Sequence, residues 1–226
     1  MFEESKCTTE NKLANFTKYV RRQNLARFMV QHELFKKQIN IKGSIVECGV
    51  HHGGGLLAWS KLSSILEPYN YHREIIGFDT FEGFPSVSEI DQENSKVKTG
   101  MFSVDYDVYK ELSKCIEEYD QNRFINNIGK IKLIKGDANF TIPKYIEENK
   151  HLLVSLLYLD FDIYEPTKNA LKYFIPRMGK GSIIAFDEIN NRDWPGETMA
   201  MLEGLNIKDC KIESFPYEPN ISFIQL

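Results

Sequence analysis

The chain has 226 residues and a formal net charge of −4 at pH 7. At roughly 100–200 residues per domain, this length predicts one domain with at most a small appendage. Hydrophobic residues make up 42% and charged residues 27%, which excludes disordered, collagen-like and low-complexity chains. The negative charge disfavours nucleic-acid binding. No apolar run approaches the ~20 residues that cross a bilayer, so no membrane span is expected.

The N-terminal segment and the cysteines both indicate a cytoplasmic protein. The first twelve residues are acidic and polar, which is unlike a secretory signal. The four cysteines are widely spaced and form no CxxC pair; they are Cys7, Cys48, Cys115 and Cys210. Free thiols in a reducing compartment are the expected state.

Apolar residues at helical spacing predict a helix over residues 11–38, and residues 1–40 are expected to form an N-terminal helical cap. The apolar face of this helix would hold Leu13, Phe16, Val20, Leu25, Phe28, Met29, Leu34 and Phe35. Residues 41–226 predict a single α/β domain. Its expected strands lie at 44–50, 74–79, 130–135, 152–159 and 181–186, and its expected helices at 56–66, 106–119, 142–148 and 166–174. The tail predicts a further helix and strands at 207–214 and 221–226. Residues 80–104 predict a long functional loop.

Acidic residues stand at the ends of five successive predicted strands. They are Glu47, Asp79, Asp137, Asp160 and Asp187. Strands that alternate with helices form a parallel sheet with right-handed crossovers, and ligands bind beyond the carboxyl ends of such strands. We therefore expect a doubly wound, mostly parallel sheet with an acidic ligand site along one edge.

A glycine-rich turn follows the first strand, in Glu47-Cys-Gly49-Val-His-His-Gly53-Gly54-Gly55. Glycines at such a turn let the backbone approach a ligand closely. The turn lacks both the GxGxxG pattern and the lysine of a P-loop, whereas Asp79, about 30 residues on, suits a ribose. An acidic pocket of this kind favours S-adenosylmethionine over NAD(P). The adjacent His51 and His52 are more typical of loop or substrate contacts than of metal ligands.

A second acidic cluster is predicted where Asp160 and Asp162 follow one strand and Asp187 and Glu188 follow the next. Adjacent strands lie about 5 Å apart, so these carboxylates would repel one another. A hard cation such as Mg²⁺ would relieve that repulsion; helix capping and solvation are the alternative. A bound cation could lower the pKa of a substrate hydroxyl, and a carboxylate not bound to it could take the proton.

Four segments resemble the TylF/macrocin-type sugar O-methyltransferases. They are SIVECGVHHGGG at 44–55, IGFDTFEGFP at 76–85, YLDFDIYEPT at 158–167 and IIAFDE at 183–188. The string Trp194-Pro-Gly-Glu-Thr198 is most similar to the dTDP-deoxyhexose 3-O-methyltransferase branch. The resemblance implies a class I (Rossmann-like) methyltransferase fold with a seven-stranded sheet and an N-terminal lid. It also implies S-adenosylmethionine, Mg²⁺-assisted transfer to a sugar hydroxyl, and a homo-oligomer.

The resemblance also implies residue roles. Cofactor contacts would come from Glu47, Gly49, Val50, Gly53, Gly54, Asp79, Thr80, Gly83, Asp137, Ala138 and Asp160. Within that set, Glu47, Gly49 and Gly53 would line the methionine end, Asp79 would bind the ribose, and Asp137 and Ala138 would lie by the adenine. Asp160, Asp187 and Glu188 would hold the metal. Asp162 would be the general base, although its role and that of Asp160 could be exchanged. The helices between Tyr19 and Glu33 would form the lid, and residues 86–104 would close over the substrate.

Two features depart from the family pattern, and other functions stay open. His51-His52 stand where an aromatic and a basic residue are usual, and Glu188 replaces a second aspartate. Trp194 would either stack on a sugar or base face or pack at a helix start. The acceptor could instead be a catechol or another small phenol. A nucleotide-sugar or NAD-dependent oxidoreductase is a third alternative, but the sequence lacks the GxGxxG and Tyr-x-x-x-Lys motifs of such enzymes. A nucleoside-binding module is a fourth, but it would have no use for the second acidic cluster.

Overall fold

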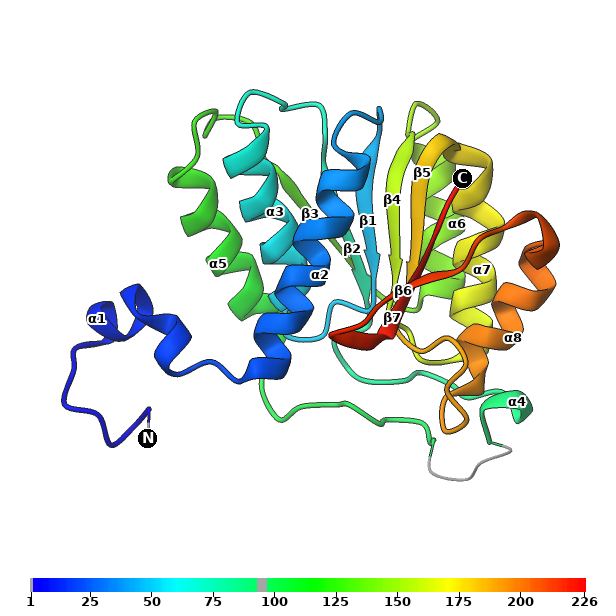
Figure 1. Ribbon diagram of the computed structural model, residues 1–226, viewed down its shortest axis with the longest axis horizontal. Helices are drawn as coiled ribbons and strands as arrows, with labels where there is room; N and C mark the ends of the chain where they lie inside the picture. Colours follow the sequence, from blue (N-terminus) through cyan, green and yellow to red (C-terminus); the bar gives the residue numbers. More distant parts are fainter. Residues whose placement is uncertain (1, 93–96) are drawn as a thin grey trace.

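The computed structural model describes residues 2–92 and 97–226. A seven-stranded sheet lies at its centre, in the order β3-β2-β1-β4-β5-β7-β6 (Figure 1). Five strands are parallel: β1 (Ser44–Cys48), β2 (Ile75–Asp79), β3 (Ile131–Lys135), β4 (Val154–Leu159) and β5 (Met178–Phe186). β7 (Glu218–Gln225) runs antiparallel to β5 and to the short edge strand β6 (Glu213–Phe215). The predicted mostly parallel α/β sheet is therefore confirmed.

Helices cover both faces of the sheet. One face packs against α2 (Arg22–Gln38), α3 (Gly54–Leu66) and α5 (Val108–Gln121). The other packs against α6 (Ala138–Glu148), α7 (Tyr164–Phe174) and α8 (Pro195–Gly204). Side chains alternate between the two faces of a strand, so Ile45 joins the first core and Val46 the second. Burial on both faces explains why the inner strands are continuous apolar runs.

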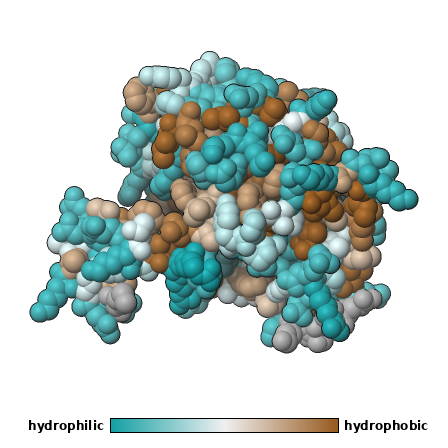
Figure 2. Space-filling view, in the orientation of Figure 1, coloured by the Kyte–Doolittle hydropathy of each residue, from teal (hydrophilic) through white to brown (hydrophobic). Residues whose placement is uncertain are grey.

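The predicted single helix over residues 11–38 is wrong. The chain forms α1 (Thr9–Ala14), a 3₁₀ turn η1 (Phe16–Lys18) and then α2, whose N-cap Arg21 has an extended backbone. Residues 2–20 form an arm that stands beside the main body (Figure 1), and it is a separate lobe in Figure 2. Leu13 and Phe16 on this arm are 64% and 50% exposed. The prediction that they pack on the apolar face of a longer helix is therefore wrong.

The rest of the proposed cap is part of the main body. Val30, Leu34 and Phe35 of α2 are buried in the sheet's core. Phe28 and Met29 of the same helix are exposed, contrary to the predicted apolar face, because the buried stripe of α2 is narrower than the spacing of its apolar residues suggests. None of the described helices is long and apolar enough to span a membrane.

The remaining differences concern loops. The predicted loop over 80–104 contains a short helix, α4 (Glu89–Gln92), and its residues 93–96 lie outside the described chain. The predicted strand at 207–214 begins as a 3₁₀ turn, η3 (Ile207–Asp209), and only its last two residues belong to a strand, β6. Another 3₁₀ turn, η2 (Ile175–Arg177), joins α7 to β5. Short, partly exposed edge segments carry little of the apolar periodicity on which such predictions depend.

Arg73 holds the amino-terminal edge of the sheet together. Its guanidinium is 3% exposed and lies 2.7 Å from the Glu67 carboxylate. It also donates to Gln38 Oε1 at 2.6 Å, to the carbonyl of Gly43 at 2.8 Å and to Ser155 Oγ at 2.5 Å. One side chain thus connects the end of α2, the starts of β1 and β4, and the end of α3.

We predict that Arg73→Met lowers the free energy of unfolding by about 3–5 kcal/mol, because it leaves the buried Glu67 carboxylate without its cation. Urea denaturation of the two proteins measures this difference. Lys144→Met is the control. Lys144 is exposed and lies as far as 4.0 Å from Glu148, and a surface ion pair of this kind contributes little to the free energy of unfolding. Equal stability of Arg73→Met and the parent chain would contradict the assigned role.

Candidate active site

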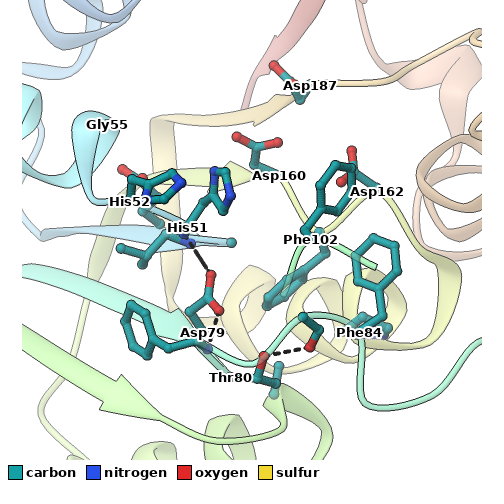
Figure 3. Close-up of a pocket in the computed structure, with 18 of the residues that line it drawn as sticks. His51, His52, Gly55, Asp79, Thr80, Phe84, Phe102, Asp160, Asp162 and Asp187 are labelled. Carbon is teal, nitrogen blue, oxygen red and sulfur yellow. Dashed lines mark hydrogen bonds between the residues drawn. The ribbon is translucent and has the colours of Figure 1, made fainter. Parts of the chain in front are cut away.

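A cavity of about 670 Å³ opens at the carboxyl ends of the parallel strands. Figure 3 shows the acids of β2, β4 and β5 facing it, with His51 and His52 from the glycine-rich turn on one side. This is the place where open parallel sheets bind ligands. Its volume lies within the range of small-molecule sites.

The structure brings nearly all predicted site residues to this cavity. Its lining includes Glu47, Gly49, Val50, Gly54, Asp79, Thr80, Gly83, Asp137, Ala138, Asp160, Asp162, Asp187 and Glu188. Among these described site residues, only Gly53 is missing from the lining. Gly53 has a φ of +83° at the N-cap of α3, and a Cβ there would meet the Leu112 side chain. Gly53 shapes the turn rather than contacting the cavity.

The glycine-rich turn presses closely against the end of β4. Gly49 has a φ of +90°, and a Cβ at this position would overlap the carbonyl oxygen of Asp160. Only glycine allows both the conformation and the approach. Gly54 differs, because a Cβ there would meet no described atom within 4 Å. The turn therefore leaves open space on its cavity side, beside the first turn of α3.

Asp79 organises this turn. Its Oδ2 accepts from the backbone N–H of Val50 at 2.7 Å and of His51 at 2.8 Å, and its Oδ1 accepts from Phe81 N–H at 2.6 Å (Figure 3). A carboxylate offers about four lone-pair directions, so Asp79 can still accept from a further donor. Asp79 can therefore both hold the turn through these N–H groups and accept a hydrogen bond from a ribose hydroxyl, as predicted.

Glu47 lies at the floor of the cavity. It is 2% exposed, and its Oε2 is buried and accepts no hydrogen bond from any residue that the structure describes. Burial raises the pKa of Glu47 to about 8. A buried carboxylate oxygen without a donor is costly, and an ammonium group entering the cavity would relieve that cost.

Asp137 and Thr80 also line the cavity. Asp137 is the N-cap of α6 and accepts from Asn139 N–H at 2.8 Å. Thr80 donates to the carbonyl of Gly83 at 2.6 Å. These contacts fix the wall where the adenine was predicted to lie, next to Ala138.

The second acidic cluster contains an unexpected cation. Arg27, from α2, donates to Asp160 Oδ2 at 2.6 Å and lies 2.9 Å from Asp187 Oδ1. Tyr158 also donates to Asp187 Oδ1, at 3.2 Å. Charge-assisted bonds to a planar guanidinium are strong, so Arg27 compensates both acids.

Asp162 is not part of the Arg27 ion pairs. It follows β4 with a φ of +61° and faces the cavity in Figure 3. Burial, together with the negative charges of Asp187 and Glu188, raises the pKa of Asp162 to about 7. A carboxyl group that titrates near neutrality can take a proton from a substrate.

The carboxylates do not converge on one point in this structure. Across residues 2–92 and 97–226, no three His, Cys, Asp or Glu side chains are arranged to hold a metal ion. Glu188 accepts from the Asn191 side chain, and Arg27 lies between Asp160 and Asp187. With Arg27 in this place, the predicted metal ligands do not fit a Mg²⁺ ion.

Residues 16–203 match the family model described as "Macrocin-O-methyltransferase (TylF)". The chain belongs to the TylF family. It is an S-adenosylmethionine-dependent O-methyltransferase. The orphaned Glu47 oxygen and the open turn at Gly54 fit the cationic end of that cofactor.

Solved structures agree with this assignment. A structure titled "Crystal Structure of CalS11, Calicheamicin Methyltransferase" is 32% identical, with a TM-score of 0.95 over 99% of this chain and 87% of that one. A second, described as the apo structure of CalS11, a TDP-rhamnose 3'-O-methyltransferase, is 31% identical with a TM-score of 0.85 over 99% and 88%. The O-methyltransferase NovP shares the fold at 19% identity, with a TM-score of 0.66 over 88% and 79%. No curated protein sequence matches the chain.

The sequence singled out Trp194 of the cavity's aromatic wall, which is formed by Phe84, Phe102 and Trp194, but not the other two rings and not Arg27. Arg27 lies between Ala26 and Phe28 on a helix predicted mainly for packing, and nothing in its spacing links it to acids more than 130 residues away. Phe84 and Phe102 come from the segment 80–104, and Phe102 stacks on Trp194 with ring centroids 5.9 Å apart. The predicted function of the loop over 80–104 was the signal for Phe84 and Phe102.

We predict that the affinity of this TylF-family protein for S-adenosylhomocysteine rises on the order of tenfold between pH 6.5 and 8.5. The pKa of Glu47 is about 8, so its carboxyl is neutral at the lower pH and becomes an anion that pairs with the ligand's ammonium at the higher. Calorimetric titration across this range measures the slope.

Glu47→Gln should bind more weakly and lose most of the pH dependence. Glu165→Gln, at an exposed position, is the matched control and should behave like the parent chain. An unchanged slope in Glu47→Gln would exclude Glu47 as the ammonium partner.

Proposed function

We propose that this enzyme methylates a sugar hydroxyl, on a nucleotide-linked deoxysugar or a glycoside. The position of Asp162 carries the proposal: its carboxyl, with a pKa of about 7, lines the same cavity as the glycine-rich turn and the aromatic residues Phe84, Phe102 and Trp194. The similarity to CalS11, a TDP-rhamnose 3'-O-methyltransferase, supports a nucleotide-linked sugar.

In the proposed reaction, Asp162 accepts the proton of the acceptor hydroxyl. An oxygen lone pair then forms the new O–CH₃ bond. The CH₃–S bond breaks as its electron pair returns to the sulfonium sulfur, which leaves S-adenosylhomocysteine. Holding the hydroxyl and the methyl group in line supplies much of the rate acceleration.

Asp162 suits the base role better than Asp160. Arg27 donates to Asp160 Oδ2 at 2.6 Å, so this oxygen is already engaged by a guanidinium. Asp160 and Asp187 are better suited to hold Arg27 at the junction of the two halves of the cavity. This leaves the unpaired Asp162 carboxylate to face the acceptor.

The aromatic wall favours an acceptor with a flat, partly apolar face. Phe102 stacks on Trp194, and Phe84 meets both rings edge-on at centroid distances of 5.4 and 6.3 Å. Such rings pack against the C–H face of a sugar or against a base. They would also accept a catechol or another small phenol, which is the second candidate acceptor.

Mg²⁺ assistance stays a prediction from the sequence. Asp160, Asp187 and Glu188 would hold the ion only after Arg27 had left the first two, because the guanidinium occupies their carboxylate oxygens. The expected homo-oligomer is likewise a proposal, supported by the exposed apolar residues of the arm, Phe2, Leu13 and Phe16. The four free cysteines agree with the proposed cytoplasmic location.

We predict that Asp162→Asn abolishes turnover while leaving S-adenosylhomocysteine binding within about twofold, because an amide cannot accept the proton. The assay offers S-adenosylmethionine with dTDP-deoxysugars, glycosides or catechols and detects the methylated product by mass spectrometry. Asp105→Asn, at an exposed loop position, is the control and should keep full activity.

Two results would count against this proposal. Retained turnover by Asp162→Asn would remove Asp162 as the base. Methylation of catechols alone, with every sugar acceptor inert, would replace the sugar reading with the phenol reading.

We predict that Arg27→Met binds Mg²⁺ at least several-fold more tightly than the parent chain, since the guanidinium and the ion need the same carboxylate oxygens. Calorimetric titration of the cofactor-free protein with MgCl₂ measures this directly. Arg22→Met, which changes an exposed arginine of the same helix, is the control. Absence of Mg²⁺ binding in both proteins would remove the metal prediction, and equal affinities would show that Arg27 and the ion do not compete.

A further inference from the structure

The turn that carries Asp162 has an unfavourable backbone conformation. Asp162 adopts a φ of +61° between the end of β4 and the start of α7. A non-glycine residue in this region is uncommon and costs free energy, so the surroundings must hold it there. The direction of the Asp162 carboxyl depends on this backbone.

One support comes from Glu197 on α8. Its side chain is completely buried, and its Oε1 accepts from the backbone N–H of Asp162 at 3.3 Å. Its Oε2 accepts from the backbone N–H of Glu188 at 3.0 Å. A single carboxyl group thus bridges the turns that follow β4 and β5.

A second support comes from Asp91 on α4. It is 1% exposed, and its Oδ1 accepts from the backbone N–H of Tyr164 at 2.9 Å. Its Oδ2 accepts from the Ser88 hydroxyl at 2.6 Å and from Ser88 N–H at 3.2 Å. Asp91 therefore ties the segment 80–104 to the other side of the Asp162 turn.

The two supports meet at Gly196. A Cβ on Gly196 would overlap Asp91 Oδ1 and lie 2.5 Å from the Tyr164 nitrogen. The first turn of α8 can approach the Asp162 turn this closely because residue 196 is glycine. Neither Asp91 nor Glu197 lines the cavity as the described residues define it, so neither contacts a ligand there.

We propose that Glu197 and Asp91 are positioning residues, which hold the Asp162 turn from both sides and so aim its carboxyl at the acceptor hydroxyl. This inference rests on the proposed function, in which Asp162 is the base. The two buried acids accept the N–H groups at positions 162 and 164, on either side of Ile163. The base is thereby fixed relative to β5 and to the segment that supplies Phe84 and Phe102.

Glu197→Gln is the first test. An amide has only one acceptor oxygen, so one of the two backbone N–H groups would face an NH₂ group and the turn would shift. A displacement of the base near 1 Å can cost about 100-fold in rate, so we expect kcat to fall about 10- to 100-fold. The dissociation constant of S-adenosylhomocysteine should stay within about twofold.

Two further variants keep the test decisive. Asp91→Asn should lower kcat in the same way through the other side of the turn, and it serves where Glu197→Gln fails to fold. Glu203→Gln is the matched control on α8. Glu203 contacts the Tyr164 hydroxyl and Lys168 but not the turn backbone, so this variant should keep the parent kcat.

A double-mutant cycle separates positioning from a general structural role. Asp162→Glu keeps a carboxylate but displaces it, and combining it with Glu197→Gln should cost much less than the product of the single effects. Parent-like kcat in both Glu197→Gln and Asp91→Asn would overturn the inference. So would multiplicative effects in the cycle, or a fall in cofactor affinity as large as the fall in kcat. Retained turnover by Asp162→Asn would instead contradict the proposed function itself.

Discussion

The main constraint on this structure is the electrostatic repulsion between carboxylates at the carboxyl ends of its parallel strands, which other groups of the protein must compensate. Neighbouring strand ends lie about 5 Å apart, and carboxylates this close must be paired, hydrogen-bonded or protonated. The acids at this edge are compensated in three different ways. Asp79 accepts three backbone N–H groups, Asp160 and Asp187 share Arg27, and Glu197 accepts two backbone N–H groups from the acidic turns. Among the described residues, Glu47 Oε2 has no hydrogen-bond partner and the Asp162 carboxyl is outside the Arg27 ion pairs, so both are left for ligands.

These two uncompensated carboxyls divide the cavity into two ends. Glu47 and the glycine-rich turn form an end suited to a cation with ribose hydroxyls. Asp162 and the aromatic wall form an end suited to a hydroxylated acceptor. A methyl transfer needs this arrangement, because the donor sulfonium and the acceptor oxygen must meet in line while a base takes the proton. The fold supplies the meeting point, since both ends are built from strand termini of one sheet.

The sequence predicted the parts of this site that follow one another along the chain. Strand periodicity located the five parallel strands, and the acids that follow them could be assigned to one edge by the topology of such sheets. The sequence could not predict the role of Arg27, because no local pattern shows that α2 brings a guanidinium to Asp160 at the end of β4. Nor could the sequence predict the role of Glu197. This residue lies within the family-like segment 194–198, but its carboxyl accepts hydrogen bonds from two backbone N–H groups and does not line the cavity that the described residues form. The arm was mispredicted because Leu13 and Phe16 have core-like spacing, while the chain leaves the body before α2 begins.

Arg27 also makes the acidic edge sensitive to the position of α2. Its pairing with Asp160 and Asp187 joins α2, which contributes to the lining of the cavity, to the ends of β4 and β5. If α2 moved away, two acids in a largely buried site would lose their cation, which is costly unless another positive group replaces it. Displacement of Arg27 and entry of a cation are therefore linked by charge, whether the cation is a metal ion or part of a ligand. Because binding and conformational free energies are coupled reciprocally, a cation that replaces Arg27 must also favour the state in which the Arg27 side chain has left Asp160 and Asp187.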